Sequence, residues 1–187
     1  MNSKSELFTL VIDKLDKLNN VEVTPSMLKG YLDEEDYIEY YAFILHDRDV
    51  NDEGEIKTPH YHVVLKCNTR YAKDTVITDF AKSLKLNRVC VKCKAYHDIY
   101  GAVQYLIHQN DTDKYQYNKA DIVSNSLADT EVYLIGQIEI DINKLIDICI
   151  GSKSLTEVYS TIGLKNSKLY HWIVKDIYSD IQTGVIE

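Results

Sequence analysis

The chain has 187 residues with 45% hydrophobic content, which is enough for one well-packed core and a small further segment. Its formal net charge of −8 argues against a protein that coats nucleic acid without specificity. The start of the sequence lacks the apolar stretch of a signal peptide, and nowhere do about 18–20 apolar residues follow one another as in a membrane span. We therefore expect a cytoplasmic protein with no membrane partner and with its four cysteines as free thiols.

The charges are distributed unevenly along the sequence. Residues 33–55 include ten acidic residues and one basic residue, whereas residues 57–94 include nine basic residues and two acidic ones. A chain that is acidic overall can still present one basic face to a phosphate backbone. The second run therefore supplies candidate DNA-binding residues, with a solvated charged surface as the alternative: Lys57, Arg70, Lys73, Lys82, Lys85, Arg88, Lys92 and Lys94.

The first predicted elements are strands and one helix. The β-branched and aromatic run Leu7–Ile12 predicts a strand, and Thr24-Pro25-Ser26 opens a helix that runs to Asp33. Tyr40–Leu45 is typical of a buried strand and ends in the polar segment HDRD. His60–Lys66 follows a charged turn and predicts the second strand of a hairpin.

Two further helices and a strand are predicted before residue 110. Thr75–Leu86 carries apolar residues at helical spacing, and Tyr96–His108 forms a second helix. Between them, Val89–Cys93 predicts a strand with Val89, Val91 and Cys93 on one face. This order of elements indicates an α+β fold, a central antiparallel sheet flanked by helices.

The last third of the chain has a different, wholly helical pattern. We place a domain boundary near residues 125–140, so that residues 1–130 form one domain and residues 131–187 a small all-helical one. The segment Ser154–Ile177 has the pattern of a helix-turn-helix with Gly163 in the turn. A helical bundle that packs Tyr159, Leu169 and Trp172 into a core or a subunit interface remains the alternative.

The tetrapeptide Pro59-His60-Tyr61-His62 suggests a metal site. Side chains alternate along a strand, so His60 and His62 project from the same face. The HDRD segment, at the end of the neighbouring predicted strand, offers His46 and Asp49 as further ligands. Imidazoles with one carboxylate suit Mn²⁺, Mg²⁺, Zn²⁺ or Co²⁺. An HxH pair alone is common, and the combination with HxxD makes the metal interpretation the favoured one.

Tyr105 is a candidate nucleophile on the predicted helix Tyr96–His108. Its phenol oxygen could attack a phosphodiester, forming a 5′-phosphotyrosine and releasing a 3′-OH. His108 lies at i+3 on the same face, either to assist the proton transfer or to pack the helix. Gly101, one turn earlier, would leave open space for a substrate backbone. The chain has 15 tyrosines, so residue type alone does not single out Tyr105.

Four segments resemble a known family in order and spacing: FTLVI, FILHDRD, TPHYHVVLK and GAVQYLIHQNDTDKYQYNKADI. They are similar to the motifs of rolling-circle replication initiators from small plasmids of Gram-positive bacteria, within the HUH endonuclease superfamily. The resemblance covers roughly residues 5–123.

This resemblance implies an origin-binding and nicking domain, a metal-dependent single-strand DNA endonuclease and strand transferase. Its metal ligands would be His46, Asp49, His60 and His62, holding Mn²⁺ or Mg²⁺, and its nucleophile would be Tyr105. The family nicks a hairpin loop in the plasmid double-strand origin. The released 3′-OH then primes a host polymerase while a host helicase unwinds the plasmid. The region after the nicking domain serves oligomerisation in similar initiators, so we expect a homo-oligomer.

Two alternatives remain open. A single-tyrosine HUH transposase also places HxH before the tyrosine, whereas conjugative relaxases place the tyrosine first. A non-catalytic origin-binding or repressor module would bind the same DNA without cutting it. The presence of all four candidate ligands together with Tyr105 favours the enzyme.

Overall fold

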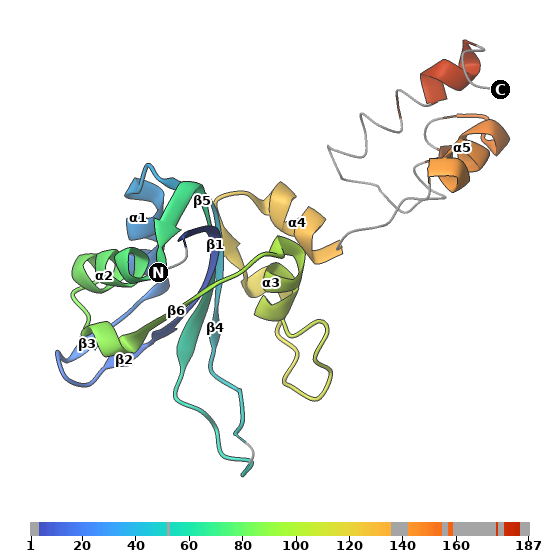
Figure 1. Ribbon diagram of the computed structural model, residues 1–187. Helices are drawn as coiled ribbons and strands as arrows, with labels where there is room; N and C mark the ends of the chain where they lie inside the picture. The colour runs from blue at the N-terminus through green and yellow to red at the C-terminus, as the bar shows by residue number, and fades with distance from the viewer. Residues whose placement is uncertain are drawn as a thin grey trace. The chain divides into compact units, whose positions relative to one another are not determined.

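The computed structural model describes residues 4–51, 53–135, 142–154, 157–158, 175 and 178–183. The chain divides into two units, Met1–Gly136 and Gln137–Glu187. The first contains a five-stranded sheet in the order β6-β1-β5-β4-β7, in which every neighbouring pair is antiparallel (Figure 1). Its strands are β1 (Lys4–Asp13), β4 (Ile38–His46), β5 (His60–Ala72), β6 (Val91–Ala95) and β7 (Val123–Ser124). A separate small ladder joins β2 (Leu15–Asp16) to β3 (Val21–Glu22).

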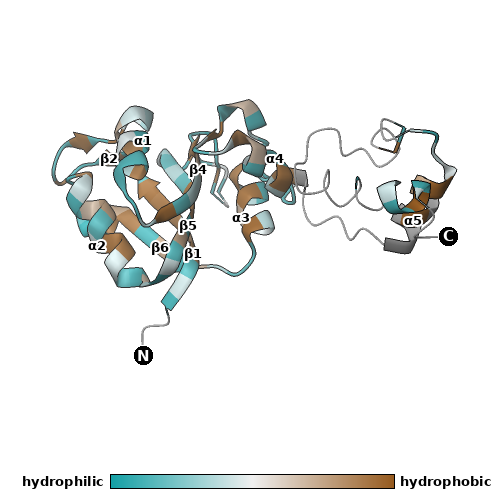
Figure 2. Cartoon of the chain, turned by 90° about the horizontal axis from the view of Figure 1, so that it is seen from above, coloured by the Kyte–Doolittle hydropathy of each residue, from teal (hydrophilic) through white to brown (hydrophobic). Residues whose placement is uncertain are grey.

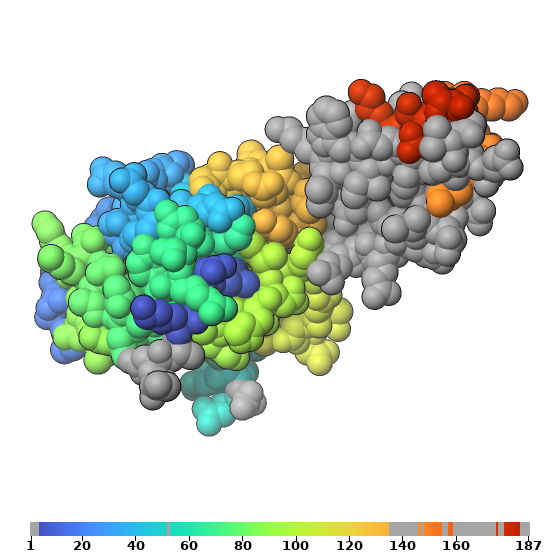
Figure 3. Space-filling view, turned by 45° about the horizontal axis from the view of Figure 1, so that its top comes forward, coloured from blue at the N-terminus to red at the C-terminus, as the bar shows by residue number. Residues whose placement is uncertain are grey.

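Helices cover both faces of the five-stranded sheet, which confirms the predicted α+β class. Figure 2 shows α1 and α2 on one side of the sheet and α3 and α4 on the other. The helices of this unit are α1 (Pro25–Glu34), α2 (Lys73–Ser83), α3 (Ile99–Leu106) and α4 (Leu127–Ile135), with short 3₁₀ helices η1 (Arg88–Cys90) and η2 (Lys119–Asp121). Atoms of α1 and α2 lie next to one another in the space-filling view (Figure 3). The rings of Tyr31 on α1 and Phe80 on α2 pack edge to face, with their centroids 4.8 Å apart.

The alternation of side chains along the strands produces two separate cores. On β1, Phe8, Leu10 and Ile12 are fully buried against the α1/α2 layer. On β4, Tyr40, Ala42 and Ile44 face the other way and pack with α3 and α4. Side chains alternate between the two faces along a strand. The polar residues at the strand ends that are in phase with Tyr40, Ala42 and Ile44 therefore lie on the α3 face of the sheet as well. That face carries the candidate site.

Most predicted elements of the first unit are confirmed. The expected strands Leu7–Ile12, Tyr40–Leu45 and His60–Lys66 lie within β1, β4 and β5, and the last two form the predicted antiparallel hairpin. Thr24 caps α1 by accepting a hydrogen bond from the Met27 N–H at 3.2 Å. The helix predicted at Thr75–Leu86 ends earlier, at Ser83.

The predicted strand Val89–Cys93 is wrong in its first half. Asn87 accepts a hydrogen bond from the Val89 N–H at 3.1 Å and so starts the 3₁₀ turn of η1. The strand begins only at Val91, and Val89 is 68% exposed rather than on the core face. A local side-chain hydrogen bond therefore overrides the β propensity of Val89.

The second unit contains α5 (Ile142–Gly151), as its apolar periodicity predicts. Ser154 accepts a hydrogen bond from the Glu157 N–H at 3.2 Å, which marks the start of a further turn. The predicted helix-turn-helix over Ser154–Ile177, with Tyr159, Leu169 and Trp172, falls almost wholly outside the described residues. Throughout the part that is described, no helix combines the length and apolar character needed to cross a membrane.

Asp16 joins the β2–β3 turn to the segment that precedes β6. Its carboxylate is fully buried and accepts hydrogen bonds from the N–H groups of Leu18, Asn19 and Asn87, the last at 2.6 Å. These bonds, above all the one from Asn87, hold the pKa of Asp16 below its ordinary value. The charged carboxylate is therefore the form that the fold stabilises.

We predict that Asp16→Asn lowers the thermal midpoint at neutral pH. Because the folded-state pKa of Asp16 lies below the unfolded value of about 4, its contribution is present above that pH and is lost as the pH falls through the folded-state pKa. The midpoint difference from wild type should therefore shrink as thermal unfolding is followed down from pH 7 to pH 3. The exposed Asp113→Asn is the control. An Asp16→Asn deficit that is independent of pH would contradict the charge argument.

Candidate functional site

Three histidines meet on the α3 face at the end of the β4–β5 hairpin. In the antiparallel register His46 is the direct partner of His60, and Ile44 is the partner of His62. The ring centroids of His60 and His62 are 5.0 Å apart, and those of His46 and His62 are 4.3 Å apart. Asp49 follows β4 and turns back to the same point. One ligand atom from each of these four residues lies within 4.8 Å of all the others.

Hydrogen bonds to backbone carbonyls determine which nitrogen of each ring is free. His46 donates from Nε2 to the Leu106 carbonyl at 2.7 Å, and His60 donates from Nδ1 to the Thr58 carbonyl at 2.8 Å. Since a carbonyl only accepts, the opposite nitrogens, Nδ1 of His46 and Nε2 of His60, carry lone pairs in the neutral rings. A carbonyl acceptor behind each imidazole is the usual support of a metal-binding histidine.

The free nitrogens face the carboxylate of Asp49. Its Oδ2 lies 3.2 Å from Nδ1 of His46 and 3.9 Å from Nε2 of His60. Burial lowers the pKa of His46, and burial together with the neighbouring imidazoles lowers the pKa of His62 to about 2, so both rings are neutral. The lone pair on Nδ1 of His46 therefore faces the Asp49 carboxylate with no proton between them, next to the neutral ring of His62. Such a donor set fits a divalent cation.

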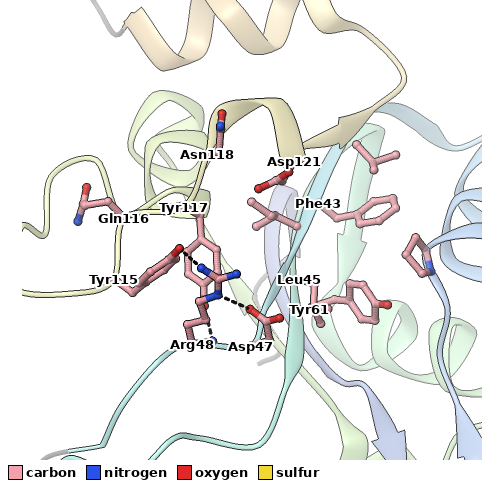
Figure 4. A pocket seen from close by; sticks show the side chains of 13 residues that line it. Phe43, Leu45, Asp47, Arg48, Tyr61, Tyr115, Gln116, Tyr117, Asn118 and Asp121 are labelled. Atoms are coloured by element: carbon pink, nitrogen blue, oxygen red, sulfur yellow. Dashed lines mark hydrogen bonds and ion pairs between the residues drawn. The ribbon is translucent and has the colours of Figure 1, made fainter.

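Tyr117 packs against the cluster, and Figure 4 shows its side chain next to those of Arg48 and Tyr115. The ring of Tyr117 stacks on that of His46 with centroids 4.3 Å apart and planes 6° apart. Its hydroxyl donates to Oδ1 of Asp49 at 3.1 Å and accepts from the Arg48 N–H at 2.9 Å. Tyr117 therefore orients two of the four candidate ligands, and it leaves Oδ2 of Asp49 facing the histidines.

Tyr105 lies beside this cluster on α3. Its ring is 5.4 Å from that of His62, centroid to centroid, and 41% of the residue is exposed. The helix turns this side chain toward the cluster because Ala102, Val103 and Leu106 occupy its buried side. The structure thus brings together the five residues predicted for the metal and the nucleophile: His46, Asp49, His60, His62 and Tyr105.

Two details of the predicted nucleophile helix are wrong. The helix spans Ile99–Leu106 rather than Tyr96–His108, because Asp98 caps its start and His108 takes a left-handed φ of 56° after its end. Gly101 leaves no open space for a substrate: a Cβ there would lie 2.6 Å from Oδ2 of Asp98, which folds back over it.

His108 is fully buried and serves the packing of the chain after α3. It donates from Nδ1 to the Tyr115 carbonyl at 2.8 Å, and its ring lies 4.5 Å from that of His46. Among the described residues its Nε2 has no hydrogen-bond partner. The hydrogen bond to Tyr115 closes the loop that follows α3. This contact favours the packing alternative for His108 over a role in proton transfer.

The predicted basic residues divide between the two faces of the sheet. Lys92 and Lys94 project from β6 on the α3 face, where their Cα partners on β1 are Val11 and Thr9. Lys57 lines a groove of about 600 Å³ with His60 and Lys92. The others lie away from the site, on α2, next to it or at the far end of β5: Arg70, Lys73, Lys82, Lys85 and Arg88. Arg88 is bound to Asp74 at 2.9 Å and Arg70 lies 3.7 Å from Glu6.

A second hollow, of about 280 Å³, adjoins Tyr105. It is lined by Thr9 and Val11 of β1, Lys94 and Tyr96, and by His62 beside Tyr105. Val11 lines both hollows, so they follow one another along the part of the sheet that β1 and β6 form. This strip of the α3 face is where an extended substrate could reach the site.

Sequence reasoning missed Tyr117 and Lys114 as members of the site. Lys114 donates a hydrogen bond to the Tyr105 hydroxyl at 3.1 Å. Both residues belong to KYQYNK, a segment that the family resemblance singled out without giving its residues a role. Periodicity is uninformative here because the segment is a loop, and only the folded chain shows what it touches.

Comparison with known proteins gives consistent matches. A family described as plasmid replication protein, origin binding domain, matches residues 2–130. A replication protein of Onion yellows phytoplasma (strain OY-M) is 32% identical over 120 residues, covering 58% of this chain and 30% of that protein. The replication protein RepB of Lactiplantibacillus plantarum is 41% identical over 80 residues, covering 42% and 34%. A Staphylococcus aureus replication protein is 30% identical over 89 residues, covering 46% and 41%. Each match spans less than half of the relative's length.

We predict that the four-residue cluster binds a divalent cation, for which Mn²⁺ is the probe, and that Tyr117→Phe weakens this binding about tenfold or more while the fold is retained. The change removes the hydroxyl that orients Asp49 and leaves the ring stacked on His46. Isothermal titration with Mn²⁺ measures the affinity, and Tyr115→Phe is the matched control, because Tyr115 bonds Arg48 through its hydroxyl and its hydroxyl contacts none of the four candidate ligands. Equal affinities for wild type and Tyr117→Phe would show that this hydroxyl does not orient the site.

Proposed function

This chain belongs to the family of plasmid replication proteins that share the origin-binding domain, and we propose that it binds a plasmid replication origin and nicks one DNA strand there. The observation that carries the proposal is the position of Tyr105. An exposed phenol stands next to a cluster of three imidazoles and a carboxylate, on the face of the sheet that also carries Lys92 and Lys94. Nucleophile, cation site and basic strip are the parts that a metal-dependent DNA nickase requires.

The reaction is a transesterification at one phosphodiester. The oxygen of Tyr105 forms a bond to phosphorus as the bond from phosphorus to the 3′ oxygen breaks. The products are a DNA 5′ end linked to Tyr105 and a free 3′-OH, which gains the proton that the phenol gives up. Because a phosphodiester replaces a phosphodiester, little energy is lost and the step can run backwards to rejoin a strand.

The proposed cation would be held by His46, Asp49, His60 and His62. Three imidazole nitrogens favour a transition-metal ion such as Mn²⁺ over Mg²⁺, which prefers oxygen. Such an ion supplies a Lewis acid for the scissile phosphate. The protein's own contribution is to keep the imidazoles of His46 and His62 neutral through burial and to keep Asp49 oriented through Tyr117.

The wider role would be initiation of rolling-circle replication. A nick at a hairpin loop in the origin leaves a 3′-OH that a host polymerase can extend, with a host helicase separating the strands. The matches to replication proteins favour this role over a transposase. Residues 131–187 would then serve the assembly of several copies or an additional DNA contact.

The test is a nicking assay on supercoiled plasmid carrying the candidate origin, with Mn²⁺ or with EDTA. We expect metal-dependent relaxation and a protein joined to the DNA 5′ end, seen on a denaturing gel. Tyr105→Phe should bind the origin with unchanged affinity and form neither nick nor adduct, because it lacks only the attacking oxygen. Tyr100→Phe, on the same helix, is the matched control. Origin binding without cleavage in any divalent metal would point to the non-catalytic module instead.

The path of the DNA gives a second prediction. If the strand crosses the β1/β6 strip, the double variant Lys92→Met/Lys94→Met loses two phosphate contacts. The slope of log affinity against log salt concentration should then fall by about 1.4 for single-stranded origin DNA. Fluorescence anisotropy measures the slope. Lys82→Met/Lys85→Met removes two lysines on the opposite side of the sheet and should leave it unchanged. The reverse pattern would place the DNA on the α2 side.

A further inference from the structure

The side chain of Lys114 lies against the proposed nucleophile. Its ammonium is 3.1 Å from the Tyr105 oxygen and 4.8 Å from the centre of the ring. A second contact, an ion pair with Asp111 at 2.6 Å, holds the ammonium from the other side. Lys114 therefore contacts the oxygen of Tyr105 and lies near the edge of its ring, and the ion pair with Asp111 restrains the ammonium there.

The loop after α3 is folded so that it returns Lys114 to this place. The Asp111 N–H bonds the His108 carbonyl at 2.9 Å, and the Lys114 N–H bonds the Asp111 carbonyl at 3.1 Å. Gln116 donates to the carbonyls of Asp111 and Lys114, both at 2.9 Å. The buried His108 closes the loop through its hydrogen bond to the Tyr115 carbonyl, and its ring lies 4.5 Å from that of His46 on the sheet. Successive turns, rather than one flexible side chain, bring the ammonium to the phenol.

We propose that Lys114 is a positioning residue for Tyr105, which holds the phenol oxygen in the orientation for attack and attracts the scissile phosphate to it. This inference rests on the proposed nicking function. A half-exposed tyrosine samples several rotamers, and each one that points away from the cation site is unproductive. One hydrogen bond and one ring contact to the same ammonium select a single orientation.

The hydrogen bond also has a direction that suits the reaction. An ammonium has only donors, so the Tyr105 oxygen accepts from Lys114 and its own hydrogen must point elsewhere. One lone pair is occupied, and the other is left for phosphorus. Lys114 keeps its three protons throughout: the oxygen–phosphorus bond forms, the bond to the 3′ oxygen breaks, and the phenol proton passes to that oxygen. The ion pair with Asp111 raises the pKa of Lys114, which keeps the ammonium charged.

The positive charge lies where negative charge gathers during the reaction. The scissile phosphate must approach to bonding distance of the Tyr105 oxygen, and the ammonium is 3.1 Å from that oxygen before DNA arrives. Removing one such preorganised donor from an active site typically lowers the rate by about 10²–10³-fold. This effect belongs to the chemical step, because origin affinity is spread over many phosphate contacts.

The experiment compares Lys114→Met with Lys114→Arg in single-turnover nicking of an origin oligonucleotide, with protein in excess and Mn²⁺ present. We expect Lys114→Met to slow adduct formation by about 10²-fold, and Lys114→Arg, which keeps a charged donor, to recover at least a large part of the loss. Origin affinity and the rise of the thermal midpoint with Mn²⁺ should match wild type in both. Lys119→Met is the matched control, a lysine of the same segment that faces Glu131 at 3.7 Å.

Three results would overturn the inference. Adduct formation by Lys114→Met within about threefold of wild type would show that the contact has no role in the reaction. Equal losses in Lys114→Met and Lys114→Arg, with a lower thermal midpoint or a lost response to Mn²⁺, would show that Lys114 serves the fold. A wild-type protein that forms no adduct at Tyr105 would overturn the nicking function together with this inference, so the two failures are distinguishable.

Discussion

The hydrogen bond from His46 to the Leu106 carbonyl connects the two halves of the site. His46 belongs to the sheet, at the end of β4, and Leu106 is the last residue of the helix that carries Tyr105. The bond fixes the distance between strand end and helix end, and it also fixes which nitrogen of His46 is free to bind a cation. Because His46 is buried and neutral, its proton cannot readily move to the other nitrogen. This contact thus helps to determine both the position of the proposed nucleophile and the tautomer of a candidate ligand, and the burial of both partners makes it costly to lose.

The loop between α3 and η2 makes three contacts with the residues of the candidate site. Lys114 donates a hydrogen bond to the phenol oxygen of Tyr105, and the Tyr115 carbonyl accepts one from Nδ1 of His108. Tyr117 then orients Asp49 and stacks on His46. A single stretch of chain therefore contacts both the proposed nucleophile and the candidate cation site. This arrangement explains why a segment without regular secondary structure carries so many tyrosine and lysine residues with defined partners.

The charge distribution becomes intelligible once the chain is folded. The acidic run in residues 33–55 contributes Asp49 to the candidate cation site, and Glu39 within it pairs with Lys66 at 2.6 Å. The basic run is divided as well. Arg88 forms an ion pair with Asp74 on the α2 side of the sheet, whereas Lys92 and Lys94 lie on the strip of the α3 face next to Tyr105. A net charge of −8 is therefore compatible with a basic approach to the site, because attraction of a DNA strand depends on the local field rather than on the total.

The sequence by itself determined β1, β4 and β5, the hairpin of the last two, and which residues are candidates for a cation site, because these depend on local regularities. Side chains alternate on a strand, so HYH had to place His60 and His62 on one face, and antiparallel pairing had to bring the end of the preceding strand beside them. The tertiary structure alone decided what depends on contacts between distant segments. Local side-chain hydrogen bonds, which periodicity does not reveal, set three further details: capping by Asp98 and Asn87 decides the start of α3, the occupied space at Gly101 and the start of β6. The basic residues divide between the two faces only once the chain is folded. Closure of the loop after α3 brings Lys114 to Tyr105 and Tyr117 to Asp49, and no periodicity in the sequence encodes this closure.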